Sequence, residues 1–149
     1  MQLIKTTGTD TRFVGLCSEL DADLNKQNGQ QLQSIYHQYN TLEKIQNVVL
    51  ALQDKAPVAC AALKEYAPGT AEVKRVFTKP FCRGQGVAAA VIASLEQLAK
   101  QQGYTRLILE TGLTMLPAQR LYHRLGFHQI PNYGQYAALP DSYCMEKAL

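Results

Sequence analysis

Three β-like runs follow one another in the middle of the chain with only short turns between them. They occupy residues 45–53 (IQNVVLALQ), 57–66 (PVACAALKEY) and 70–78 (TAEVKRVFT), and the turns are Asp54 to Pro57 and Pro68-Gly69. Turns this short join only antiparallel strands, because a parallel return needs about a dozen residues or more. The sequence therefore predicts an antiparallel meander, which restricts the fold more than any other feature.

The chain before the meander predicts one strand and two helices. Residues 2–7 (QLIKTT) suit a short strand, and residues 31–39 (QLQSIYHQY) suit a short helix. Between them lies a longer helix, with Thr9 or Asp10 as its N-cap and Asn28-Gly29 at its end. Its apolar residues recur at helical spacing and are Phe13, Leu16, Cys17, Leu20 and Leu24. Three acidic residues lie off this stripe and are expected to form a solvated face: Glu19, Asp21 and Asp23.

The chain after the meander alternates between helix and strand. The first of these helices ends at Gly103. Its one apolar stripe consists of Ala88, Val91, Ile92, Leu95, Leu98 and Ala99. Residues 104–111 (YTRLILET) then predict a strand that runs parallel to the strand before this helix, if the usual crossover holds. A further helix begins at Pro117 and ends at Gly126, with Ala118, Leu121, Tyr122 and Leu125 on its apolar face. Residues 127–130 and 142–149 supply the last strands.

This element order predicts an α+β fold. The expected architecture is a mixed, mostly antiparallel sheet of about six to seven strands, flanked by about four helices. The chain has 149 residues, a length that suits a single domain over residues 1–149.

A glycine-containing turn opens the helix that follows the meander. The segment Arg83-Gly84-Gln85-Gly86-Val87-Ala88 offers no Ser, Thr, Asp or Asn to satisfy the free N–H groups of the first helical turn. Glycine lets a ligand approach the backbone closely, and Arg83 adds a positive charge, so the turn suits a phosphate or pyrophosphate. The alternative is a tight turn whose free donors are bound by water.

Two kinds of phosphate site fit this turn to different degrees. Residues 84–89 (GQGVAA) match the dinucleotide pattern G-x-G-x-x-G/A, and Glu110 lies about where a ribose-binding acid belongs. However, residues 79–83 separate the glycines from their strand, the preceding strands form a meander, and the chain is too short for the remaining βαβ units. A Walker loop is excluded because no Gly-Lys-Ser/Thr is present.

Residues 72–88 (EVKRVFTKPFCRGQGVA) are similar to the pyrophosphate-binding motif of the GNAT superfamily of N-acetyltransferases. In the pattern [R/Q]-x-x-G-x-[G/A], the defined positions are Arg83, Gly86 and Ala88. A second segment, LPAQRLYHRLGF, resembles the family signature A-x-x-L-Y-x-x-x-G-F through Ala118, Leu121, Tyr122, Gly126 and Phe127. The chain departs from the family pattern at Met115, where Asn is frequent, and at Thr78, where Val is frequent.

The resemblance implies acetyl-CoA as cosubstrate. The pyrophosphate would be bound by the backbone of Arg83, Gly84, Gln85, Gly86, Val87 and Ala88, and Ala118 of the second motif would also contact the cofactor. The pantetheine arm would pair with the strand at Val76, Phe77 and Thr78, where a backbone N–H would hold the thioester oxyanion. Arg120 and Arg124 would either reach the terminal phosphate of CoA or be ordinary surface charges.

The resemblance also implies two proton-transfer roles. Tyr122 corresponds to the tyrosine that acts as general acid toward the leaving thiolate. Glu72 lies on the strand before the turn and could take the proton of the attacking ammonium, with Glu110 or a water chain as the rival base.

The acceptor is expected to be the primary amine of a small molecule. The resemblance places Tyr36, Tyr39, Asn40, Tyr133 and Tyr136 around it. Lys74 and Arg75 would either pair with a carboxylate, which would favour an amino acid, or face water. A peptide N-terminus remains open, whereas polyamines rank lower because no acidic cluster is present.

Composition argues against several other classes of protein. The net charge of +3 comes from scattered Lys and Arg residues, so nucleic-acid binding is not indicated. Neither a signal peptide nor a membrane span is expected. The four cysteines form no C-x-x-C pair and the histidines no ligand pattern, so we expect no metal and free thiols in the cytoplasm. Cys82 is expected to be a spectator rather than a reactive thiol.

Two other functions stay open, a nicotinamide-nucleotide-binding oxidoreductase and a noncatalytic acyl-CoA-binding module. Small acetyltransferases of this family often pair, so a homodimer also stays open.

Overall fold

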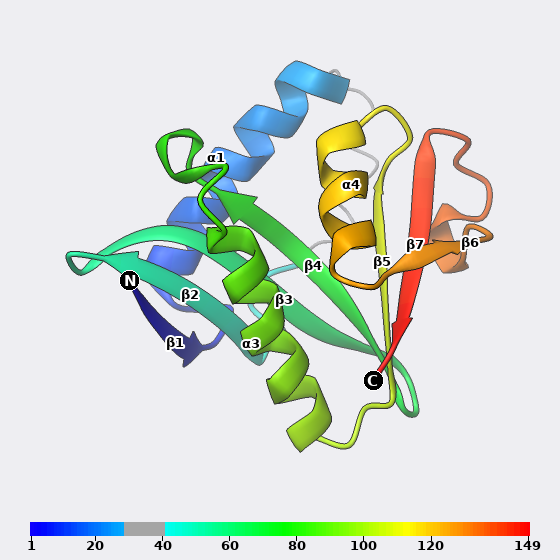
Figure 1. Cartoon of the computed structure of the whole chain (residues 1–149), viewed down its shortest axis with the longest axis horizontal. Coiled ribbons are helices and arrows are strands. Elements are labelled where there is room, and N and C mark those ends of the chain that lie inside the picture. The colour runs from blue at the N-terminus through cyan, green and yellow to red at the C-terminus, as the bar shows by residue number, and fades with distance from the viewer. Residues whose placement is uncertain (29–40) are drawn as a thin grey trace. The chain divides into compact units, whose positions relative to one another are not determined.

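The computed structural model describes residues 1–28 and 41–149 (Figure 1). Its seven strands form one sheet in the order β1-β2-β3-β4-β5-β7-β6. The pairs β1–β2, β2–β3, β5–β7 and β6–β7 are antiparallel, whereas β4 and β5 are parallel. The predicted α+β fold is therefore confirmed. Three α-helices, α1, α3 and α4, lie in the described residues, and the further helix expected at residues 31–39 falls outside them.

The chain divides into two compact units. Unit 1 consists of Met1–Leu63 and Arg75–Leu95, and unit 2 consists of Lys64–Lys74 and Glu96–Leu149. Three elements contribute residues to both units: β3 (Ala56–Ala67), β4 (Thr70–Thr78) and α3 (Val87–Gln101).

In unit 1, β1 (Gln2–Thr6) pairs with β2 (Asn47–Gln53), which in turn pairs with β3. The β2–β3 hairpin is closed by Asp54 and Lys55, whose φ angles are 50° and 68°. Two central residues with positive φ are typical of a type I′ turn, the turn that best matches strand twist. The expected four-residue turn is therefore only two residues long, and β3 begins at Ala56.

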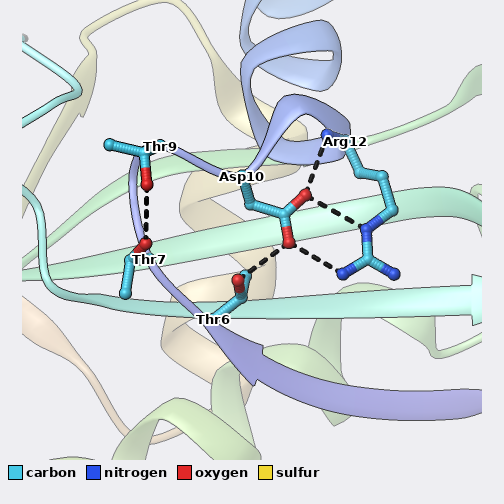
Figure 2. Close-up of polar contacts among 5 residues, drawn as sticks. All are labelled: Thr6, Thr7, Thr9, Asp10 and Arg12. Carbon is cyan, nitrogen blue, oxygen red and sulfur yellow. Dashed lines mark hydrogen bonds and ion pairs between the residues drawn. The ribbon is translucent and has the colours of Figure 1, made fainter.

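Helix α1 (Thr11–Asn28) starts at an aspartate cap (Figure 2). An Asp10 carboxylate oxygen accepts a hydrogen bond from the backbone N–H of Arg12 at 2.9 Å, as expected of an N-cap residue. The other oxygen accepts from the Thr6 hydroxyl at 2.8 Å and from the Arg12 guanidinium at 2.7 Å. These contacts, the Arg12 side-chain bond above all, hold the pKa of Asp10 well below its ordinary value. Asp10 rather than Thr9 is thus the cap.

The core of unit 1 lies between α1 and the strands. The apolar stripe of α1 supplies Phe13, Leu16 and Cys17, which are buried. They belong to one cluster with Ile45, Val48, Leu50, Leu52, Cys60, Ala62 and Phe77. Burial of this stripe explains why the helix forms despite its several polar residues.

In unit 2, β5 (Arg106–Gly112) pairs with β4 from Thr70 opposite Arg106 to Val73 opposite Leu109. Its other edge pairs with β7 (Ser142–Ala148), which also pairs with the short β6 (His128–Ile130). Helix α4 (Leu116–Arg124) begins with Pro117 in its first turn, and the 3-10 turn η2 spans Gly134–Tyr136. The parallel pairing predicted from the crossover is confirmed.

No helix among the described residues is both long enough and apolar enough to cross a membrane.

Candidate active site

Strand β4 contains three charged side chains, and all three are buried. Glu72, Lys74 and Arg75 expose 4%, 7% and 7% of their surface. Charged residues are almost never buried without a partner, so a strand of this kind marks a structural ion network or a functional site. The alternative in which Lys74 and Arg75 face water is therefore wrong.

Arg75 is held by α1. Its guanidinium donates hydrogen bonds to the Cys17 carbonyl at 3.0 Å and to Asp21 at 2.9 Å. Its φ angle is 56°, a left-handed conformation in the middle of a strand, and its own carbonyl accepts a bond from the Cys60 thiol at 3.2 Å. With its charge satisfied by Asp21, Arg75 is a poor partner for the carboxylate of a substrate.

Three acidic residues of α1 form ion pairs with cations on the segment that leads to the glycine turn. We define the glycine turn as residues 84–88. The pairs are Glu19–Lys79 at 3.5 Å, Asp21–Arg75 at 2.9 Å and Asp23–Arg83 at 3.4 Å. The three residues keep part of their surface in solvent, as expected, but each of them also pairs with a cation. Helical spacing shows which residues leave the core stripe, but not which neighbour they meet.

The glycine turn exposes its backbone. Gly84 and Gly86 have φ angles of 74° and 81°, and a Cβ placed on either would meet no atom within 4 Å. Gly86 accepts the first helical bond of α3, from Ala90 N–H at 3.1 Å, and the first turn of the helix carries no acidic residue. This turn therefore presents the positive end of a helix whose first turn carries no acidic residue.

Arg83 is anchored beside this turn. Its Nε donates to the Thr78 carbonyl at 2.8 Å, and its guanidinium carbon lies 5.6 Å from the ring centroid of Phe77. Phe77 is itself in the core of unit 1, so its side chain is structural. The Arg83 side chain keeps about half of its surface exposed, which places a solvent-accessible positive charge next to the turn.

Unit 2 contains a cluster of one carboxylate, one ammonium and three tyrosines. We call it the tyrosine–carboxylate cluster; its members are Tyr66, Glu72, Lys74, Tyr133 and Tyr136. The Tyr133 hydroxyl donates to one oxygen of Glu72 at 2.5 Å, and Lys74 Nζ lies 3.3 Å from the other. The Tyr133 ring packs edge-on against Tyr66 and Tyr136, at centroid distances of 5.2 and 5.5 Å. The structure thus brings together four residues singled out from the sequence: Glu72, Lys74, Tyr133 and Tyr136.

Burial determines the protonation of the tyrosines in this cluster. Burial, and after it the Glu72 carboxylate, raises the pKa of Tyr133 and that of Tyr136 far above the ordinary value. Both phenols therefore stay neutral at physiological pH and can donate hydrogen bonds.

Tyr122 lies on the buried face of α4. Its ring packs edge-on against Phe127 at 5.8 Å. Burial, with a smaller effect from the Glu110 charge, raises the pKa of its phenol above the ordinary range. Glu110, the rival base, accepts a hydrogen bond from the Ser142 hydroxyl at 2.7 Å.

Gln119 was missed by the sequence analysis. It is buried on α4, and its amide donates to the carbonyls of Gly112 and Leu113 at 2.9 and 3.0 Å. These bonds fix α4 against the end of β5 and so position Tyr122. A polar residue next to the apolar stripe gives no signal in the sequence, because its partners are backbone atoms.

The remaining predicted residues fall into three groups. Tyr36, Tyr39 and Asn40 lie outside the described residues. Arg120 and Arg124 are exposed on α4, and Ala118 is half-buried there. Cys82 is buried beside Gln53, which suits a spectator thiol. Among residues 1–28 and 41–149, no group of three or more His, Cys, Asp or Glu side chains is arranged to hold a metal ion.

Comparison with known proteins places both motifs in one family. Residues 14–127 match the model of the acetyltransferase (GNAT) family. The uncharacterized N-acetyltransferase YsnE of Bacillus subtilis (strain 168) is 36% identical over 92 residues, which cover 60% of this chain and 61% of YsnE. The chain thus matches about three fifths of the length of this relative.

Solved structures agree on the fold. A proposed acyl-CoA N-acyltransferase from Klebsiella pneumoniae subsp. pneumoniae MGH 78578 aligns with a TM-score of 0.81 and 28% identity, over 99% of this chain and 97% of the other. The PaiA N-acetyltransferase of Thermoplasma acidophilum, solved in complex with coenzyme A, aligns with a TM-score of 0.69 and 15% identity over 100% of both chains. At 15% identity, the second likeness supports the fold alone.

Proposed function

Because this chain belongs to the acetyltransferase (GNAT) family, we propose that it transfers the acetyl group of acetyl-CoA to the primary amine of a small molecule, by direct attack of the amine on the thioester. An amino acid is one candidate acceptor. The family match includes residues of both units. We propose that the two units act as a single acetyltransferase domain.

The glycine turn is the proposed site for the pyrophosphate of acetyl-CoA. Two glycines with positive φ leave open space over the backbone, and the adjacent Arg83 supplies a cation. The N–H groups of a helix start bind anions through their free donors and the helix dipole. The match of residues 14–127 to the acetyltransferase (GNAT) family supports acetyl-CoA as the ligand of this turn. Val76, Phe77 and Thr78 precede the turn and would bind the pantetheine arm through their backbone.

Glu72 is the proposed base. An alkylamine with a pKa near ~10 arrives protonated and must lose a proton before it attacks. Glu72 is held by Tyr133, and Tyr136 lies in the same cluster, so the carboxylate lies among residues expected to bind the acceptor. Glu110 is a weaker candidate because its hydrogen bond is to Ser142 rather than to a member of the tyrosine–carboxylate cluster.

Tyr122 is the proposed general acid. Its raised pKa keeps the phenol protonated over the working pH range, so it can donate a hydrogen bond and then a proton to the sulfur as the thiolate leaves. Gln119 acts indirectly by holding α4 in place. The acid is thus available without any preceding ionisation step.

The observation that carries this proposal is the open glycine turn in a chain that matches the family. Calorimetric titration with acetyl-CoA, with CoA and with NAD tests it directly. We expect saturable binding of acetyl-CoA and no binding of NAD. Binding of NAD alone would favour a nicotinamide-dependent oxidoreductase, and acetyl-CoA binding without turnover on any amine would favour a noncatalytic module.

The acid role has its own test. In Tyr122→Phe the proton donor is removed while the ring is kept, so kcat should fall by about 10²- to 10⁴-fold. The Kd for acetyl-CoA should stay within about twofold. Unchanged turnover would remove Tyr122 from the mechanism.

A further inference from the structure

Lys74 is a buried ammonium that contacts two members of the tyrosine–carboxylate cluster, Glu72 and Tyr136. Its Nζ lies 3.3 Å from Glu72, 3.4 Å from the Tyr136 hydroxyl and 6.0 Å from the Tyr136 ring centroid. Residues two apart on a strand share a face, so β4 itself places Lys74 beside Glu72. Only 5% of the Lys74 side chain and 6% of the Glu72 side chain are exposed, so bulk water screens this pair weakly.

Other ionisable groups face the pair from every neighbouring element of unit 2. They are Lys64 and Tyr66 on β3, Glu110 on β5, Cys144 on β7, and Tyr133 and Tyr136 around η2. The tyrosines stay neutral, and Lys64 and Glu110 act on Lys74 in opposite directions. Lys74 is therefore the cation in direct contact with Glu72 among the described residues.

We propose that Lys74 is a positioning residue for the acetyl transfer, which keeps the Glu72 carboxylate ionised and oriented toward the acceptor amine. This inference rests on the proposed function, and nothing in the family motifs of the chain assigns the role. A buried carboxylate without a cation favours its protonated form, and a protonated Glu72 could not accept the proton of the incoming ammonium. Tyr133 holds one oxygen and Lys74 the other, which fixes the plane of the carboxylate.

The ion pair can be tested without any activity. In Lys74→Met, Glu72 loses its cation, so the folded state binds a proton more tightly than the unfolded state does. A carboxyl group that binds its proton more tightly in the folded state stabilises the fold at low pH. This stabilisation is lost as the pH rises through the folded-state pKa of the carboxyl group. We expect the Tm deficit of Lys74→Met to grow from about pH 5 to about pH 8. The double variant Glu72→Gln/Lys74→Met, which carries neither charge, should show no such trend.

The positioning role is tested by the pH profile of kcat/KM. Lys74→Met should move the acidic limb to higher pH by about one unit or more, so that activity near neutrality falls by about tenfold and recovers at alkaline pH. Lys74→Arg should restore the wild-type profile. Lys147→Met is the matched control, because Lys147 also pairs with a glutamate of unit 2, Glu96, at 2.7 Å. Its profile should keep the wild-type acidic limb.

The outcomes separate the inference from the proposed function. A loss of activity in Lys74→Met that is equal at every pH, or a Tm deficit independent of pH, would overturn the positioning role. If the stability trend holds but the wild type acetylates no amine, the proposed function fails and the catalytic role of Lys74 fails with it, while the ion pair stands.

Discussion

Replacing Gly86 with alanine tests two roles of this glycine: its left-handed backbone conformation and the close approach of the cofactor that it allows. The φ angle of Gly86 is 81°, and a Cβ there would meet no atom within 4 Å. Alanine therefore has room but must adopt a left-handed conformation, which costs about 1–2 kcal/mol. For a chain of this size, each kcal/mol lowers Tm by about 2–4 °C, so the expected loss is about 2–8 °C.

The effect on cofactor binding should be larger than the strain alone produces. A methyl group at Gly86 would occupy part of the open space that we propose the pyrophosphate enters. Losing even one hydrogen bond to a charged group costs about 1.5–3 kcal/mol, or at least about tenfold in Kd. Calorimetric titration of Gly86→Ala with acetyl-CoA measures this directly.

Gly103→Ala provides the matched control. Gly103 follows α3, has a φ angle of 88° and likewise has open space where a Cβ would be, but it lies outside the glycine turn. It should lose a similar amount of Tm and keep the wild-type Kd. If Gly86→Ala binds acetyl-CoA as tightly as Gly103→Ala does, the assignment of the pyrophosphate to this turn is refuted.

Three further predictions concern Asp10 and Asp23 in unit 1 and Gln119 in unit 2. Asp10→Ala removes the cap of α1 and should cost about 1 kcal/mol at neutral pH. Because the folded-state pKa of Asp10 is lowered, its contribution is lost as the pH falls, so the Tm difference from wild type should shrink on acidification; a constant difference would contradict this. Gln119→Leu leaves two backbone carbonyls without their donor and should cost about 1–3 kcal/mol in thermal unfolding, whereas an unchanged Tm would remove its anchoring role. Asp23→Asn frees Arg83 and should tighten acetyl-CoA binding by up to about fivefold at low salt, with no gain at high salt; weaker binding would show that Asp23 supports the site.

The strands could be predicted from the sequence because turn residues and apolar runs delimit them. The expected runs at 45–53, 57–66 and 70–78 correspond to β2, β3 and β4, with differences of two residues or fewer. The largest local difference is the hairpin at Asp54 and Lys55, where positive φ angles in non-glycine residues allow a tighter turn than the composition suggests. Both motifs of the family were also visible, because they are short, contiguous patterns.

The partners of charged residues could not be predicted, because they come from distant parts of the chain. Arg75 meets Asp21 across 54 positions, and Glu72 meets Tyr133 across 61. Sequence periodicity assigns a residue to a face of its own element but says nothing of the element opposite. For this reason Tyr133 and Tyr136 could be proposed as acceptor residues only through the family resemblance, whereas the role of Lys74 required the structure.

The four buried cysteines affect how the proposed reaction can be followed. Acetyl transfer releases CoA with a free thiol, and a thiol-reactive dye would report that product while Cys60, Cys82 and Cys144 stay hidden from the reagent. Even Cys17, whose pKa its hydrogen bond with Cys60 lowers to about 7, exposes only 1% of its surface. Without substrates, the same dye measures the rate of local opening of the protein. Each protein thiol can react only when the structure around it opens, so the rate of colour development reports how often each of these regions unfolds locally.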